Sequence, residues 1–214
     1  MISTVAFDIG ETLINETRIW SRWADRLGIP RLTFMGVLGG IAAQGRSHSE
    51  IFKLFSPAFD LEEELKSWRE ADPDGLRENF DAHDLYADVR PAFGRLVGIG
   101  KRIVIAGNQP GQARGALERM DLGADQILVS ADLGIEKPSP AFFEKISVAV
   151  DAKPGEIMYV GDRLDNDVLP AKASGLRAVL IRRGPWGYLH AEWPQADQAD
   201  AIIDSLLEIP ALVN

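Results

Sequence analysis

The chain has 214 residues, and 46% of them are hydrophobic, so it can bury a substantial core. Its 32 acidic and 23 basic residues give a net charge of −9, which offers no support for binding nucleic acid or an acidic membrane surface. The absence of cysteine excludes disulfides, thiolate catalysis and cysteine metal sites. The N-terminus enters a strand without a leader pattern, and the longest weakly polar stretch is too short to span a bilayer. We therefore expect a soluble, cytoplasmic protein with no nucleic-acid or membrane partner.

The first predicted element is a short apolar strand, residues 4–8, which ends in Asp8. Residues 15–86 then show helical segments separated by turn-rich stretches such as ADPDG, without a convincing strand. We expect this long insert to form a separate helical cap. Ligands of open α/β sheets bind beyond the carboxyl ends of the strands, where the insert leaves the core, so a cap there would exclude water and select substrates.

Arginines recur every fourth residue in the front half of this insert, at Arg18, Arg22 and Arg26. An apolar stripe that includes Ile19 and Trp23 runs beside them, as expected for one amphipathic helix. Arg18 and Arg22 are therefore candidates to contact an anionic substrate, although a solvated helix face would give the same pattern.

From residue 87 onward, strands and helices alternate. Further apolar runs of strand length lie at residues 102–107, 126–130, 157–161, 178–182 and 201–204. They are β-branched and nearly continuous, which is typical of parallel strands buried on both faces. This alternation predicts an α/β fold with a doubly wound, mostly parallel, Rossmann-like sheet. The core would comprise residues 1–14 and 87–214, with residues 15–86 as the inserted cap.

Acidic residues follow two of the predicted strands. Asp8 ends the first strand, Asp162 follows the run at 157–161, and Asp167 lies on the next helix. Because the carboxyl ends of neighbouring parallel strands converge, Asp8 and Asp162 could hold a divalent cation with Asp167 nearby. Mg²⁺ suits such a site, because it takes oxygen ligands and needs only one or two carboxylates plus a substrate phosphate. The cation would neutralise the phosphate so that one carboxylate could attack phosphorus.

Two other segments are predicted to bind the phosphate. The segment GNQPGQ follows a strand and opens a helix, so Gly107, Asn108 and the neighbouring backbone N–H groups form a plausible anion cradle. Lys137 lies at a strand-to-helix connection and could neutralise the same phosphate. Gly-rich turns and loop lysines are usually structural or solvated, so it is their order around the two acidic strand ends that favours a functional role.

Four motifs together resemble those of the haloacid dehalogenase-like hydrolase superfamily over nearly the whole chain: DIGETL, AGN, EKPSPAFF and GDRLDND. The resemblance implies that Asp8 is a nucleophile that forms an aspartyl-phosphate, and that Lys137 stabilises the nucleophile and the transferring phosphate. It also implies that the backbone carbonyl of Gly10 and the carboxylate of Asp162 bind magnesium. Asp167 would join the coordination shell or orient a metal-bound water. The insert resembles the helical cap of the family.

Two glycines depart from the usual phosphatase pattern of that family. Gly10 replaces an aspartate that acts as acid to the leaving group and then as base to water. Gly107 replaces a Ser or Thr whose hydroxyl contacts phosphate. Glu11 is adjacent to Gly10 and could supply the missing proton. The alternative is that Glu11 only faces solvent or caps the turn, and the sequence does not distinguish these roles. Asn166 is expected to orient the loop of the fourth motif.

We therefore predict a magnesium-dependent phosphatase that hydrolyses a small phosphorylated metabolite through an aspartyl-phosphate at Asp8. An alternative is a phosphate-binding or regulatory protein of the same fold with little turnover. A haloacid dehalogenase is the third candidate, because that branch also lacks the second acid, but it does not require the metal-binding aspartate that this chain keeps. The sequence leaves the substrate and the oligomeric state open. His48, His83 and His190 lack metal-ligand spacing and are expected to be surface or packing residues.

Overall fold

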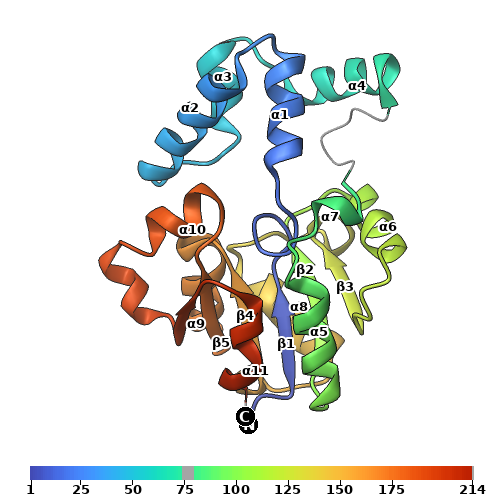
Figure 1. Cartoon of the computed structure of the whole chain (residues 1–214), viewed down its shortest axis with the longest axis vertical. Coiled ribbons are helices and arrows are strands. Elements are labelled where there is room, and N and C mark those ends of the chain that lie inside the picture. The colour runs from blue at the N-terminus through green and yellow to red at the C-terminus, as the bar shows by residue number, and fades with distance from the viewer. Residues whose placement is uncertain (74–79, 214) are drawn as a thin grey trace.

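The computed structural model describes residues 1–73 and 80–213, and a parallel sheet forms the centre of its core (Figure 1). The strands within these residues are β1 Thr4–Phe7, β2 Arg102–Gly107, β3 Gln126–Val129, β4 Ile157–Gly161, β5 Arg177–Ile181 and β6 Ala201–Ile203. Their order in the sheet is β3-β2-β1-β4-β5-β6. Every neighbouring pair is parallel. The end of β1, which leads into Asp8, therefore lies near the middle of the sheet.

Helices cover both faces of this sheet, which explains why the strand sequences are almost continuously apolar. The helices of the core are α5 Val89–Gly98, α6 Gly111–Arg119, α7 Ser130–Leu133, α8 Pro140–Ala149, α9 Leu169–Ala173, α10 Gly184–His190 and α11 Ile209–Leu212. Val5 and Phe7 of β1 belong to one buried cluster, with α5, α6 and α11, whereas Ala6 belongs to another, with α8 and α9. The predicted α/β fold with a doubly wound parallel sheet is confirmed.

Local sequence marks several helix starts. Pro140 opens α8, where the missing N–H of proline leaves no intrahelical hydrogen bond unmade. In the insert, α4 spans Leu61–Ala71, and the carboxylate of Asp60 accepts a hydrogen bond from the N–H of Glu63 at 3.0 Å. The glutamates in the first turn of α4 also interact favourably with the helix dipole.

The insert forms a helical layer beyond the carboxyl ends of the strands, at the top of Figure 1. Besides α4, its helices are α1 Thr17–Arg26, α2 Arg31–Ala43 and α3 Glu50–Phe55. Their shared core centres on Trp23, whose ring centroid lies 4.7 Å from those of Phe52 and Trp68. Residues 74–79 of the predicted cap lie outside the described residues. We retain the division into a core of residues 1–14 and 87–214 and a cap of residues 15–86 as a proposal.

Two adjacent segments connect this layer to the core. The N–H of Asn15 donates to the carbonyl of Asp84 at 2.7 Å, and the N–H of Tyr86 donates to the carbonyl of Leu13 at 3.0 Å. The outgoing and returning segments are therefore held side by side by backbone hydrogen bonds. This narrow junction lies a few residues beyond Asp8, so it fixes where the helical layer begins relative to the strand ends.

An ion pair between a partly exposed arginine and a buried aspartate strengthens the junction. Asp84 is 6% exposed, and its carboxylate accepts hydrogen bonds from the guanidinium of Arg18, with Arg18 Nε at 2.7 Å, and from the N–H of Asp81 at 3.0 Å. Arg18 thus joins α1 to the 3-10 helix Ala82–Asp84, where the chain returns to the core.

Among the described residues, none of the helices has both the length and the apolar character needed to cross a bilayer.

Replacing Arg18 tests how much the ion pair at this junction contributes to the stability of the fold. We expect Arg18→Gln to lower the free energy of unfolding by about 1–3 kcal/mol, because the Asp84 carboxylate would stay buried without its charged partner. The partial exposure of Arg18 places the effect toward the lower end. In the matched control, Arg31→Gln, an exposed pair with Asp25 is lost and stability should change little. Urea unfolding followed by circular dichroism measures both, and equal losses would contradict the structural role of Asp84.

Candidate active site

Two aspartates lie where neighbouring strands end. Asp8 follows β1 and Asp162 follows β4, and the two strands pair with Phe7 opposite Val160. The backbone N–H of Asp8 donates to the carbonyl of Val160 at 2.8 Å. The fold therefore delivers both carboxylates to the same edge of the sheet.

A third aspartate comes from the segment after β4. Asp167 lies in the π-helical turn Leu164–Val168, and its side chain is fully buried. The N–H of Arg163 donates to its Oδ2 at 2.9 Å and fixes the carboxylate. Carboxylate oxygens of Asp8, Asp162 and Asp167 lie within 4.8 Å of one another. The structure thus brings together the three acids that were selected from the sequence.

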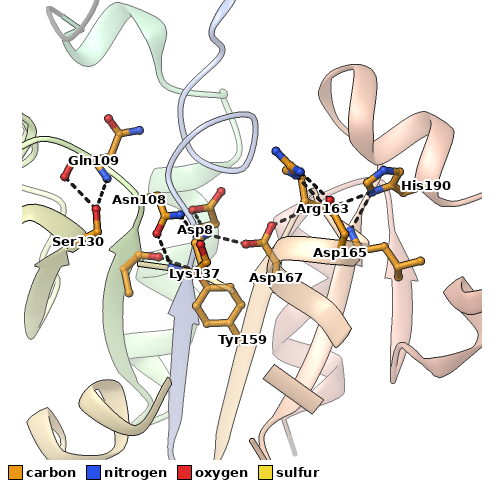
Figure 2. A network of polar contacts seen from close by, with 12 residues as sticks. Asp8, Asn108, Gln109, Ser130, Lys137, Tyr159, Arg163, Asp165, Asp167 and His190 are labelled. Carbon is orange, nitrogen blue, oxygen red and sulfur yellow. Dashed lines mark hydrogen bonds and ion pairs between the residues drawn. The ribbon is translucent and has the colours of Figure 1, made fainter. Parts of the chain in front are cut away.

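The ammonium group of Lys137 contacts two of these acids, as Figure 2 shows. Its Nζ donates to Oδ1 of Asp8 and to Oδ1 of Asp167, both at 2.6 Å. The side chain of Asn108 holds the lysine backbone, because its Oδ1 accepts from the N–H of Lys137 at 2.8 Å and its Nδ2 donates to the carbonyl of Lys137 at 2.9 Å. That amide, which we expected to bind phosphate, is engaged in positioning Lys137.

The charges at this site do not balance. Burial raises the pKa of Asp8 to about 6, although Lys137 counteracts it. Burial and the neighbouring Asp167 and Asp8 carboxylates raise the pKa of Asp162 well above its usual range. Burial lowers the pKa of Lys137, but Asp167 and Asp8 more than offset it, so that pKa ends well above its ordinary value. Three carboxylates facing one ammonium leave an excess of negative charge that a divalent cation would offset.

The donor set fits magnesium. Asp8 and Asp162 offer carboxylate oxygens, the ligand type that Mg²⁺ prefers, from two adjacent strand ends. Gly10 lines the same cavity as these acids, so the contribution of its carbonyl remains consistent with the fold and stays a prediction.

Gly107 lies directly against Asp8. A methyl carbon built on Gly107 would lie 2.8 Å from Oδ1 of Asp8 and 3.0 Å from Cδ1 of Ile9. A side chain here would therefore crowd the carboxylate, which explains why glycine suits this position. Gly107 does not contribute to the cavity above Asp8, so the geometry gives its expected phosphate contact no support.

A cavity of about 750 Å³ opens over the acids, between the core and the helical layer. Its floor includes Asp8, Lys137 and Asp162, and its rim includes Asn166 from the loop of the fourth motif. The insert contributes Glu16, Trp20, Gly45, Ser47, His48 and Ser49. The volume suits a small molecule enclosed from both sides.

An aromatic wall joins the two layers beside this cavity. The ring centroid of His48 lies 5.8 Å from that of Trp20 and 6.3 Å from that of Trp186, with both pairs edge-on. The guanidinium of Arg163 lies 5.1 Å from the Trp186 ring centroid and is held by Asp165 at 3.0 and 2.7 Å. His48 is thus a packing residue, as expected, but it also lines the cavity.

The other two histidines lie outside the cavity lining. His83 is exposed, whereas His190 is fully buried and its Nδ1 accepts a hydrogen bond from the N–H of Leu164 at 3.0 Å.

Glu11 is buried in the turn after β1 and does not face solvent. Its Oε1 accepts from the N–H of Glu16 at 2.9 Å and its Oε2 accepts from the hydroxyl of Tyr86 at 2.5 Å. Burial raises the pKa of Glu11, although both hydrogen bonds counteract the shift. Glu11 lines the cavity, but its engagement with Tyr86 and Glu16 makes it the cap of the turn, one of the roles we expected.

The arginine stripe of α1 faces away from this cavity. Arg18 and Arg22 line a separate hollow near His83, at the base of the helical layer. Arg18 is bound to Asp84 there, and Arg26 pairs with Glu64 of α4 at 2.6 Å. The geometry therefore gives no support to the expectation that Arg18 and Arg22 contact the substrate. The rotation of α1 about its axis, which the sequence pattern leaves undefined, places Trp20 toward the cavity instead.

Sequence reasoning missed Glu16, which lines the cavity close to Gly10. It immediately precedes α1, where an acidic residue usually serves the helix start. The sequence does show an acidic residue a few positions beyond Asp8. The direction in which its side chain points, however, depends on how the insert folds back over the core.

Comparison with known proteins agrees with this fold. The model of the haloacid dehalogenase-like hydrolase family matches residues 2–175. Glyceraldehyde 3-phosphate phosphatase of Methanopyrus kandleri is 41% identical over 61 residues, which are 28% of this chain and 26% of that protein. Phospholysine phosphohistidine inorganic pyrophosphate phosphatase of Xenopus laevis is 32% identical over 161 residues, 69% of this chain and 57% of that protein.

Structural similarity extends further along the chain. The crystal structure of a predicted phosphoglycolate phosphatase from Haemophilus somnus matches with a TM-score of 0.72 and 21% identity, covering 100% of this chain and 98% of that one. The sequence matches span only about a quarter of the first of these curated relatives and just over half of the second, whereas the match to the Haemophilus somnus structure covers both chains almost completely.

The close contact between β4 and Asp167 can be tested at Gly161. A methyl group on Gly161 would overlap the Asp167 carboxylate, so Gly161→Ala must displace that side chain from Lys137. We expect a loss of about 1–3 kcal/mol in the free energy of unfolding. Gly155→Ala is the matched control, because the space around Gly155 is open, and it should have little effect. Chemical unfolding of both variants measures the difference, and equal stability would show that Asp167 is not held as described.

Proposed function

The chain belongs to the haloacid dehalogenase-like hydrolase family, and we propose that it is a magnesium-dependent phosphatase acting on a small phosphorylated metabolite. The observation that carries this proposal is the group of Asp8, Lys137 and Asp162 on the floor of the cavity, with the buried Asp167 carboxylate bound to Lys137 behind them. The charge of a phosphate must be neutralised before an anionic nucleophile can approach it. The ammonium of Lys137 supplies one positive charge at this site, and the proposed magnesium would supply the rest.

Asp8 is the proposed nucleophile. One of its carboxylate oxygens would bond to phosphorus as the bond from phosphorus to the leaving-group oxygen breaks, which leaves an aspartyl-phosphate. Water would then attack phosphorus, and the Asp8 carboxylate would depart to restore the enzyme. Lys137, 2.6 Å from Oδ1 of Asp8, would stabilise both the carboxylate and the charge on the transferring group.

Asp8 and Asp162, with the carbonyl of Gly10, are the residues proposed to hold magnesium. When bound, the ion would supply Lewis-acid stabilisation of the phosphate oxygens. Asp167 has a distinct place, because its two oxygens receive Lys137 Nζ and the N–H of Arg163. We therefore assign Asp167 mainly to the orientation of Lys137, with its carboxylate close enough to influence the metal site.

The helical layer would choose the substrate. Trp20, Ser47 and His48 line the cavity opposite the acids, so a substrate phosphate at Asp8 would extend its organic part toward them. The volume of about 750 Å³ favours a small metabolite. Because the relatives are named for glyceraldehyde 3-phosphate and for phospholysine, phosphohistidine and pyrophosphate, these compounds belong in the first substrate panel.

A phosphate-binding or regulatory protein with little turnover is the second candidate. Gly10 and Gly107 favour it, because neither offers a side chain to the proton transfer or to the phosphate. The paired metal-site acids Asp8 and Asp162 speak against the third candidate, a metal-free dehalogenase.

Replacing the nucleophile tests the enzyme proposal. We expect magnesium-dependent phosphate release from at least one compound of the panel, lost on addition of a chelator, and a fall in kcat of about 1,000-fold or more in Asp8→Asn. Asp25→Asn, on the exposed surface of α1, is the matched control and should retain activity. Undiminished turnover in Asp8→Asn would refute the nucleophile assignment. Magnesium-dependent binding of phosphate by the wild type without release would favour the binding protein, and halide release without magnesium would favour the dehalogenase.

A further inference from the structure

The space beside Gly10 is filled by a carboxylate from another residue. A methyl carbon built on Gly10 would lie 2.5 Å from Oε1 of Glu16 and 3.0 Å from its Cδ. Glu16, Gly10 and Asp8 all line the same cavity. A carboxylate therefore stands beside residue 10 even though that residue has no side chain, and a side chain at residue 10 would displace it.

Several contacts fix the position of Glu16. Its backbone N–H donates to Oε1 of Glu11 at 2.9 Å, and its carbonyl accepts from the N–H of Trp20 at 2.9 Å. The indole Nε1 of Trp20 donates to Oε2 of Glu16 at 3.0 Å, while Oε1 is the atom nearest to Gly10. Trp20 is 4% exposed, so the indole that holds Oε2 is itself held by packing. The carboxylate is thus oriented by its surroundings, as a proton-transfer group must be.

We propose that Glu16 is the catalytic acid and base of this phosphatase, an inference that rests on the proposed function. In the first step, the Glu16 carboxylic acid donates its proton to the leaving-group oxygen as the bond from that oxygen to phosphorus breaks. In the second step, the resulting carboxylate accepts a proton from water as the water oxygen bonds to phosphorus and the bond from phosphorus to Asp8 breaks. Glu16 ends protonated, so the proton balance closes without another group.

The other acids of the cavity have different partners. Asp162 belongs to the cluster around the proposed metal, as does Asp167 below the cavity lining, and the two oxygens of Glu11 accept hydrogen bonds from the N–H of Glu16 and the hydroxyl of Tyr86. Asp165 is paired with Arg163, and Glu136 is exposed at the rim. Glu16 lies beside Gly10, two residues after the nucleophile, and Trp20 orients its carboxylate.

The origin of Glu16 gives it a second property. It directly precedes α1, at the junction where the insert leaves the core, and its anchor Trp20 belongs to α1. The backbone of the acid is therefore held by the core turn through Glu11 and its carboxylate by Trp20 of the helical layer, whereas the nucleophile is positioned by the sheet.

Substrates with different leaving groups distinguish a catalytic role of Glu16 from a structural role. An alkyl leaving group needs a proton as it departs, whereas p-nitrophenolate does not. We expect Glu16→Gln to lower kcat/KM for an alkyl phosphate such as glycerol 3-phosphate by about 100- to 10,000-fold, and for p-nitrophenyl phosphate by less than about tenfold. Because the water-activating step is also slowed, p-nitrophenolate should appear in a burst of about one per chain. Glu62→Gln, an exposed position of α4, is the matched control and should behave as the wild type.

A rescue experiment uses the overlap at Gly10. Gly10→Asp alone should not raise activity, because the new side chain would compete with Glu16 for the same space. In a Glu16→Ala background the space is vacant, and we expect Gly10→Asp to recover alkyl phosphate turnover at least about tenfold relative to Glu16→Ala. Circular dichroism of each variant shows that it is folded.

The outcomes separate the two proposals. An active wild type whose Glu16→Gln variant loses alkyl and aryl turnover equally, or loses neither, would overturn the role of Glu16 while leaving Asp8 as the nucleophile. Absence of magnesium-dependent phosphate release from the wild type would overturn the proposed function, and the role of Glu16 with it.

Discussion

The buried ammonium of Lys137, shared between Asp8 and Asp167, is the interaction on which the rest of the site depends. Charged groups that are almost fully removed from water are stable only with fixed partners, so each of the three restricts the position of the other two. Neighbouring features serve this arrangement: Gly161 leaves room for Asp167, and Asn108 holds the backbone of Lys137. One ammonium does not neutralise three carboxylates, which is why we propose that a metal ion binds beside them and offsets the charge of a substrate phosphate.

Core and cap supply different parts of the site. Parallel pairing of β1 with β4 determines where Asp8 and Asp162 lie, and this geometry is rigid because both strands are buried on both faces. The helical layer, which we propose to be a cap, is joined through a narrow junction, and Glu16 and Trp20 line the cavity from this side. The nucleophile is therefore held by the end of a strand, and the proposed proton donor by the turn after that strand and by Trp20 of α1.

The strands and the acids at their ends were predictable from the sequence, because a continuous β-branched run followed by aspartate has few alternative interpretations. The environment of Arg18 and Arg22 was not. Periodicity defines which residues of α1 share a face, but not which neighbour that face meets, and Asp84, the partner of Arg18, is 66 residues away. Asn108 was placed correctly at the strand end, yet its engagement with Lys137 depends on a loop that periodicity does not describe.

Gly10 is a second case in which the sequence pattern does not show which side chains meet in the fold. A motif compares residues at fixed spacing, so a missing side chain at residue 10 looks like missing chemistry. The spacing of a motif does not show which side chain fills the space beside a given residue. Here the carboxylate of Glu16, which directly precedes α1, occupies the position that a side chain at residue 10 would need. With Glu16 anchored by Trp20, glycine at residue 10 becomes a requirement of the arrangement, because any larger residue would expel the carboxylate. The two residues therefore form one functional unit, and a substitution at either has to be interpreted together with the other.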